Sequence, residues 1–478
     1  MRVSLRIAKE EWRYWLRSRL VQIGLVVFAL LLIVTSIVTA GRVSELRHER
    51  GHQQEQAEQT FLNQPARHPH RMVHYGHYAF RTPTPLAGFD PGVDAVTGQS
   101  IFLEGHHQNT AMFAGARASA RAGGFGVLTP ALIYQLFLPL LLIAIGHAAI
   151  VREREAKTLG PLMAQALKGT TLYFGKGMAL MALIAGLSLP ALFGSGLAVA
   201  QGESFFAAMT LYGAYLLYLS IWGALILTVS CFVRSRGIAL GILLLIWIFS
   251  ALVVPRIAVT WASYSLPSEG KIITDMRMND DLRALGDGHN AADPAFAKLK
   301  SNLLAQYNVE SVDDLPVNFR GVVASNSEEK LTETLNRYAE KRMSRELEQS
   351  KRLDSFGIIS PYVAISAASR AVAGTDLRTH HRFLRETEDL RYSFVQGLNK
   401  AHIEELSYAD DIARNKSEAA GQKARISSAN WTVLQDFRFE PNSSAARVKE
   451  ASASLISLLI WFFGIVFTGL LAARRLKP

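Results

Sequence analysis

Six apolar stretches, separated by polar segments, set the pattern of the chain. None of them contains an Asp, Glu, Lys or Arg residue. They cover residues 20–40, 125–151, 177–200, 205–233, 237–255 and 451–473. A helix needs roughly 20 apolar residues to cross a bilayer. The pattern therefore predicts an all-α integral membrane protein with six transmembrane helices.

The chain begins with an amphipathic segment, residues 1–19, in which Val3, Ile7 and Trp15 recur among basic residues. This spacing predicts a cytoplasmic helix in the headgroup region, and an ordinary basic flank of the first span is the alternative. The apolar region of a signal peptide has only about 7–15 residues. Residues 20–40 are therefore expected to remain as the first span.

Positive charge distinguishes the short connecting segments. Sixteen Lys and Arg residues lie in four of them, whereas the hairpin 201–204 has none. The four are residues 1–19, 152–176, 234–236 and 474–478. Because Lys and Arg favour the cytoplasmic side, we expect both termini in the cytoplasm and the long segments 41–124 and 256–450 outside. The net charge of +11 then suits anionic lipid better than nucleic acid, which is not an expected partner.

The two long segments differ in character. Segment 41–124 is polar and irregular, with scattered Pro and Gly, and is expected to be a loop. Segment 256–450 is predicted to be a mainly helical domain in its own right. Its residues 325–352 and 376–411 are rich in Glu, Lys, Arg, Leu and Ala, as amphipathic helices are.

The loop 152–176 is basic and amphipathic, as a membrane subunit needs in order to receive force from a soluble motor. Its apolar residues recur at helical spacing: Leu159, Leu162, Met163 and Leu167. Glu153 and Glu155, near the expected helix start, suit the positive end of the helix dipole. We expect one face of this loop to dock in a groove of the motor.

No phosphate-binding loop accompanies this feature. The nearest match, Gly169 to Lys176, has five residues between its glycines and Gly177 where Mg²⁺ would need Ser or Thr. The chain is therefore not expected to be an enzyme or to bind a cofactor, and ATP and Mg²⁺ would be held by a partner.

The histidines of the first long segment are candidate metal ligands. The candidates are His68, His70, His74 and His77, followed by His106 and His107. Imidazole suits transition metals, but the spacing matches no recognised metal motif, and polar packing explains such residues equally simply. We expect no metal site here.

One face of the fourth span carries Tyr212, Tyr215, Tyr218 and Trp222. These residues predict either a path for an amphipathic substrate or helix packing with an interfacial aromatic belt. Ion-coupled transport is not expected, because ionisable groups are missing from the spans, apart from His147 near one end.

The order of these parts resembles the ABC-2 type permeases, the membrane subunits of a family of ATP-driven transporters (type V exporter-like). Their loop after the second span has the pattern E-x-G-T-L…GK. The matching residues here are Glu155, Thr158, Leu159, Gly175 and Lys176. Lys157 stands where the family has glycine, which questions the local turn.

Residues 74–98 and 101–109 are similar to the first external loop of a subgroup with large extracytoplasmic insertions. The resemblance implies a permease in the bacterial inner membrane that exports an unidentified substrate. It also implies two copies of a cytoplasmic ABC ATPase, a second permease (identical or related), and a periplasmic partner protein. The alternative is a membrane-anchored scaffold or sensor whose external domain binds a periplasmic protein or a metal.

Overall fold

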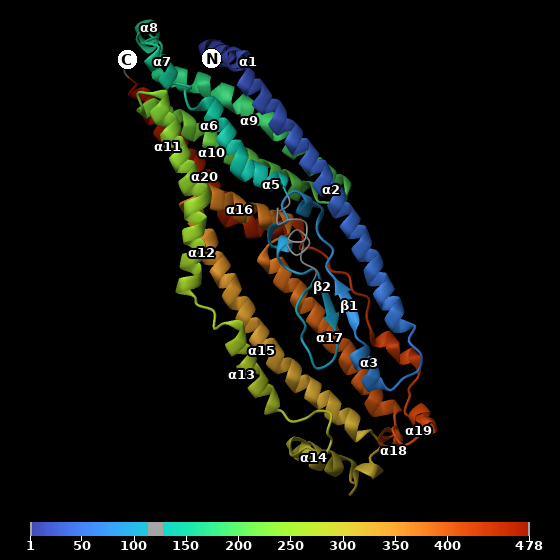
Figure 1. Ribbon diagram of the computed structural model, residues 1–478. Coiled ribbons are helices and arrows are strands. Elements are labelled where there is room, and N and C mark those ends of the chain that lie inside the picture. Colours follow the sequence, from blue (N-terminus) through green and yellow to red (C-terminus); the bar gives the residue numbers. More distant parts are fainter. Residues whose placement is uncertain (1, 113–127, 477–478) are drawn as a thin grey trace.

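The computed structural model describes residues 2–112 and 128–476, and helices dominate it (Figure 1). One two-stranded antiparallel sheet pairs β1 (His77–Phe80) with β2 (Ser100–Leu103), with His77 opposite Leu103. The prediction of a mainly helical protein is confirmed.

Six helical segments within the described residues are long and apolar enough to cross a membrane. The first is α2 (Arg19–Leu62). The second runs from Pro130 to Glu155 and contains α5 (Pro130–Leu132), the π-helical turn η3 (Ile133–Phe137), α6 (Leu138–Gly146) and α7 (Val151–Glu155). The others are α9 (Gly169–Ala200), α10 (Phe205–Phe232), α11–α12 (Arg236–Ile248 and Val254–Ser265, joined by the π-helical turn η4, Phe249–Val253), and α20 (Ser444–Arg474). Each overlaps one of the six predicted apolar stretches, and residues 125–127 of the second stretch lie outside the described residues. The chain is a multi-pass membrane protein, and both termini lie at one end of the bundle (Figure 1).

Two of these helices extend well beyond the predicted spans. Helix α2 continues past residue 40 to Leu62, although segment 41–124 was expected to be a loop. The fifth span, expected to end at Pro255, continues as α12 to Ser265. Residues 42–62 are rich in Glu, Gln and Arg, which favour helix without being apolar, so hydropathy alone does not reveal the extension.

Most of the remaining helices lie away from the membrane bundle (Figure 1). They are α3 (Pro69–Tyr75), α13 (Lys271–Arg283), α14 (Ala297–Tyr307), α15 (Phe319–Ser355), α17 (Leu377–Glu405), α18 (Tyr408–Ala413) and α19 (Glu418–Lys423). The short 3₁₀ turns are η1 (Pro85–Gly88), η2 (Gly92–Ala95), η5 (Pro294–Phe296), η6 (Val312–Asp314), η7 (Phe356–Ile358) and η8 (Ser428–Val433). Helix α16 (Pro361–Ala373) packs on α10 and α20 and is largely buried.

The two long polar segments share a single hydrophobic core. Phe61 and Met72 from the first pack with Phe394, Leu398 and Trp431 from the second, and all five are fully buried. Segment 256–450 was predicted to be a domain in its own right, whereas here its core is completed by residues 41–112. Alternating apolar positions reveal that a face is buried, but not which distant segment covers it.

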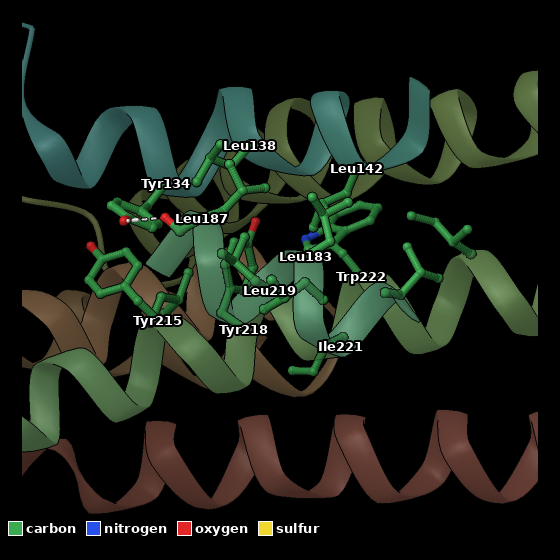
Figure 2. Packing of buried hydrophobic residues seen from close by; sticks show 14 of the residues in the cluster. Tyr134, Leu138, Leu142, Leu183, Leu187, Tyr215, Tyr218, Leu219, Ile221 and Trp222 are labelled. Carbon is green, nitrogen blue, oxygen red and sulfur yellow. Dashed lines mark hydrogen bonds between the residues drawn. The ribbon is translucent and has the colours of Figure 1, made fainter. Parts of the chain in front are cut away.

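Helix α10 lies at the centre of the membrane bundle (Figure 2). Its Tyr215, Tyr218 and Trp222 are fully buried and pack among leucines of α6 and α9. Tyr215 also accepts a hydrogen bond from Gln135 Nε2 at 2.8 Å. These three aromatic residues fill the interior of the bundle.

Proline residues lie within three of the spans, and buried hydroxyl groups bind backbone groups near them. Pro139 has no N–H for the carbonyl of Gln135, and the Tyr218 hydroxyl donates to that oxygen at 2.8 Å. Beside Pro190, the Tyr134 hydroxyl accepts from Ala191 N and donates to Leu187 O (Figure 2).

The same arrangement recurs in the fifth span. The π-helical turn η4 comes just before Pro255, and Ser360 of the α16 N-cap donates to the carbonyl of Ser250 at 2.8 Å. Unpaired backbone groups are costly where no water can reach them. The buried hydroxyl groups thus permit proline within these apolar helices.

We predict that Tyr218→Phe lowers the free energy of unfolding by about 1–3 kcal/mol, because it leaves a buried carbonyl without a donor. Thermal unfolding of the purified chain in detergent measures the change. Tyr212→Phe is the control, since no hydrogen bond of its hydroxyl is found among the described residues. Equal stability of the two variants would contradict the role assigned to Tyr218.

Candidate functional site

The predicted coupling loop lies at the end of the bundle that carries both termini (Figure 1). It forms two short helices, α7 (Val151–Glu155) and α8 (Leu159–Ala164), instead of one amphipathic helix. Gly175 and Lys176 are already part of the third span, because α9 begins at Gly169. Beside them lies α1 (Arg2–Arg17), the predicted amphipathic helix.

Glu11 connects α1 to the spans. Its side chain is 2% exposed and accepts hydrogen bonds from Arg152 Nη2 at 2.6 Å and from Lys176 Nζ. Arg152 also stacks on the Tyr14 ring, with the guanidinium carbon 3.7 Å from the ring centre. One carboxylate thus joins α1, α7 and α9.

Lys176 extends this contact to a second acid. Its ammonium group donates to Glu153 Oε1 at 2.9 Å, and Glu153 Oε2 accepts from the Thr158 hydroxyl at 2.7 Å. We call Glu11, Arg152, Glu153 and Lys176 the ion cluster. Charges alternate along it, as they must where ionised groups are buried, because an unpaired buried charge is strongly destabilising.

Helix α7 is also bound to α10 and α11. Ser230 Oγ of α10 accepts from the backbone N–H groups of Ile150 and Val151, both at 2.9 Å. Glu155 forms an ion pair with Arg236 at the start of α11 and accepts from its backbone N–H at 2.7 Å. The five residues of α7 therefore bind α1, α9, α10 and α11.

Gly175 permits the close approach of α1. A Cβ atom at this position would lie only 2.7 Å from Ile7 Cβ. The turn between α7 and α8 has Lys157 in the left-handed region, at φ +54°. This is where the ABC-2 pattern has glycine, so the turn is kept here at a cost of about 1–2 kcal/mol.

The apolar residues of the loop lie differently from the expectation of a docking face. Leu159 is 1% exposed, and Met163 and Leu167 pack against the bundle core, leaving Leu162 half-buried. The exposed residues of the loop include three charged ones, Glu155, Lys157 and Lys168. The others before α9 are Ala156, Thr158, Pro161, Ala164, Gln165 and Ala166.

Four of the six histidines considered as metal candidates occupy three environments. His68 is buried, with Nε2 3.1 Å from Asp411 Oδ1. His77 is buried beside Gln54. His70 and His74 lie one turn apart on α3, and their Nε2 atoms are 3.2 Å from each other.

Glu11 is the residue that sequence reasoning missed. It lies on the face of α1 that also carries Ser4 and Trp15, the buried face of this helix. A carboxylate at helical spacing within the apolar face of a basic helix was the available signal, because it needs a buried cation as partner.

Comparison with known proteins concerns the part outside the bundle. Residues 272–440 match the family model of a domain of unknown function, DUF3526. None of the curated proteins matches the chain. The matched residues run from α13 to just beyond Phe439, so they include α15 and α17 but neither the ion cluster nor the membrane spans.

Proposed function

We propose that this protein is a permease subunit of an ATP-driven ABC transporter. It would move its substrate, in the direction of export, using a separate ATPase subunit. The observation that carries the proposal is the ion cluster, through which a short surface loop is rigidly joined to the amino-terminal helix and to several spans. The ABC-2 resemblance of Glu155, Thr158, Leu159, Gly175 and Lys176 supports it.

The proposed coupling begins at the exposed side of α7 and α8. A force applied there reaches α6 through the chain, α9 through Lys176, and α1 through Arg152 and Glu11. Closure of two ATPase subunits would move these elements together and shift the second and third spans. The apolar residues of the loop would keep it attached to the bundle, and the exposed residues around Pro161 would face the ATPase.

The partners follow from this assignment. ATP and Mg²⁺ would be bound by two copies of a cytoplasmic ABC ATPase, and a second permease, identical or related, would complete the membrane domain. The region containing the DUF3526 match would lie in the periplasm, where it is available to a partner protein. Both termini and the ion cluster would then be cytoplasmic in a bacterial inner membrane.

We predict this orientation from the charge of the short loops. In a Cys231→Ala background, a cysteine at the exposed Lys330 should react with a membrane-impermeant maleimide in intact cells. A cysteine at the exposed Gln165 should react only after the cells are opened. The reverse labelling pattern would invert the topology and remove the ATPase from the ion cluster.

We also predict that Glu11→Gln uncouples the loop from α1. A hydrogen bond to a charged group contributes about 1.5–3 kcal/mol, so we expect about a tenfold loss of transport-coupled ATP hydrolysis in reconstituted membranes. Membrane insertion and co-purification of the ATPase should be unchanged. Glu10→Gln is the matched control, because Glu10 is exposed and bonds only Arg13 among the described residues.

Two results would contradict the proposal. Equal activity of the Glu11→Gln and Glu10→Gln variants would show that the ion cluster does not transmit force. Failure of any ATPase to co-purify with the parent would favour the membrane-anchored scaffold or sensor.

A further inference from the structure

Four histidines from three separate segments meet on the surface of the region outside the bundle. His70 and His74 come from α3, His106 follows β2, and His289 lies in the connection between α13 and η5. One ring nitrogen from each lies within 4.8 Å of the others. The ring centres of His70 and His106 are 5.0 and 4.9 Å from that of His289.

We propose that His70, His74, His106 and His289 form a binding site for a divalent first-row transition metal ion. The inference goes beyond the proposed transport function and does not depend on it. The Nε2 atoms of His70 and His74 are 3.2 Å apart. Ligands at the usual Zn–N distance of about 2.0–2.1 Å in a tetrahedral site are separated by about 3.3 Å, so this pair needs little adjustment.

His106 has the outer-shell partner that is typical of a metal ligand. Its Nδ1 lies 3.0 Å from Glu328 Oε2, and its backbone N–H donates to the same oxygen at 3.2 Å. Its Nε2 is buried and without a hydrogen-bond partner among the described residues. A carboxylate that binds one ring nitrogen fixes the ring and leaves the lone pair of the other nitrogen for the metal.

Glu328 is itself held firmly. Its side chain is fully buried and forms an ion pair with Arg391, which also binds Glu388. These contacts fix the Glu328 carboxylate beside the His106 ring.

Donor chemistry determines the class of ion. Mg²⁺ and Ca²⁺ require oxygen ligands, whereas imidazole nitrogen suits Zn²⁺, Cu²⁺ and Ni²⁺. Among divalent ions, Cu²⁺ is expected to bind more tightly than Zn²⁺ in a site of this kind. Nearby carboxylates of Glu104, Asp287 and Glu328 offset the charge of the ion, and Arg320 opposes it.

The neighbouring group of His68, His402 and Asp411 is different. Asp411 already accepts hydrogen bonds from His402 at 2.7 Å, from Asn318 at 3.2 Å and from Arg414. His68 Nδ1 accepts from the backbone N–H of His70 at 3.1 Å and so caps α3. His402 Nδ1 has no hydrogen-bond partner among the described residues, but both ring nitrogens of His68 and both oxygens of Asp411 already have partners. This network positions α3, and we assign no metal to it.

The experiment uses the full chain, purified in detergent and stripped of metal with a chelator. Equilibrium dialysis against Zn²⁺, and separately Cu²⁺, with elemental analysis should show one tightly bound ion per chain. Loss of an outer-shell partner weakens metal binding about 10–100-fold. Loss of a ligand should cost more, so His74→Ala and His289→Ala should each weaken binding by more than this. Both residues are exposed, so neither change should impair folding.

A matched control is available on α2. His48 and His52 are also exposed and one turn apart, with ring centres 4.5 Å from each other, but no third histidine joins them among the described residues. The double variant His48→Ala/His52→Ala should keep the tight site. Added Zn²⁺ should raise the thermal midpoint of the parent and of this control, but not that of His289→Ala.

The outcomes separate the alternatives. Absence of a tightly bound ion in the stripped parent would overturn the proposal, as would equal affinity of the parent and His289→Ala. Loss of the ion in the His48/His52 variant alone would move the site to α2. Because the readout is bound metal and thermal midpoint, it is independent of ATP hydrolysis and thus of the proposed function.

Discussion

The spans depend on one constraint: backbone groups released by proline must find partners where water is excluded. Pro139, Pro190 and Pro255 each lie within an apolar span. Tyr218, Tyr134 and Ser360, all from other helices, bind backbone groups near them. Each proline therefore requires a particular neighbouring helix at a particular depth, which fixes how α6, α9, α10 and α11–α12 pack. Ser360 extends the same requirement to α16, and this joins the bundle to the region outside it.

Hydropathy and charge were sufficient to predict the membrane bundle, because these properties are local in the sequence. The six spans, the helical character and the amphipathic helix α1 were all foreseen. The hydrogen-bond partners of the buried hydroxyl groups were not predicted. Tyr218 and Gln135 are far apart along the chain, and nothing in the sequence near either residue indicates that they meet. For the same reason the shared core of residues 41–112 and 256–450 could not be predicted. Each segment shows apolar positions, but neither identifies what covers them.

The same distinction applies to the two sites. Glu153, Thr158 and Lys176 were candidates from one contiguous loop, and in the structure Glu153 contacts the other two. Glu11 lies on another helix and was overlooked among the many charges of α1. Along the chain, His70 and His74 suggested little more than a polar loop. They become candidate metal ligands only in the fold, where His106, after β2, and His289, in the α13–η5 connection, lie beside them. Sequence motifs for metal sites do not cover ligands so far apart along the chain.

Helix α2 gives the two proposed sites a mechanical connection. It begins at Arg19, directly after the helix that carries Glu11, and ends at Leu62, shortly before α3 with His70. A continuous helix of 44 residues is about 66 Å long and transmits displacement along its axis. If ATPase closure moves α1, the outer end of α2 must move with it or bend. An ion that binds α3 to the α13–η5 connection would resist such movement. By thermodynamic linkage, a metal ion that shifts α2 towards one position must also bind more tightly when α2 is in that position, and the coupling free energy of the two effects is the same.

We therefore expect Zn²⁺ to change the rate of ATP hydrolysis by the ATPase reconstituted with the parent, but not with the His289→Ala variant. Identical responses of the two proteins would show that the metal site and the ion cluster act independently.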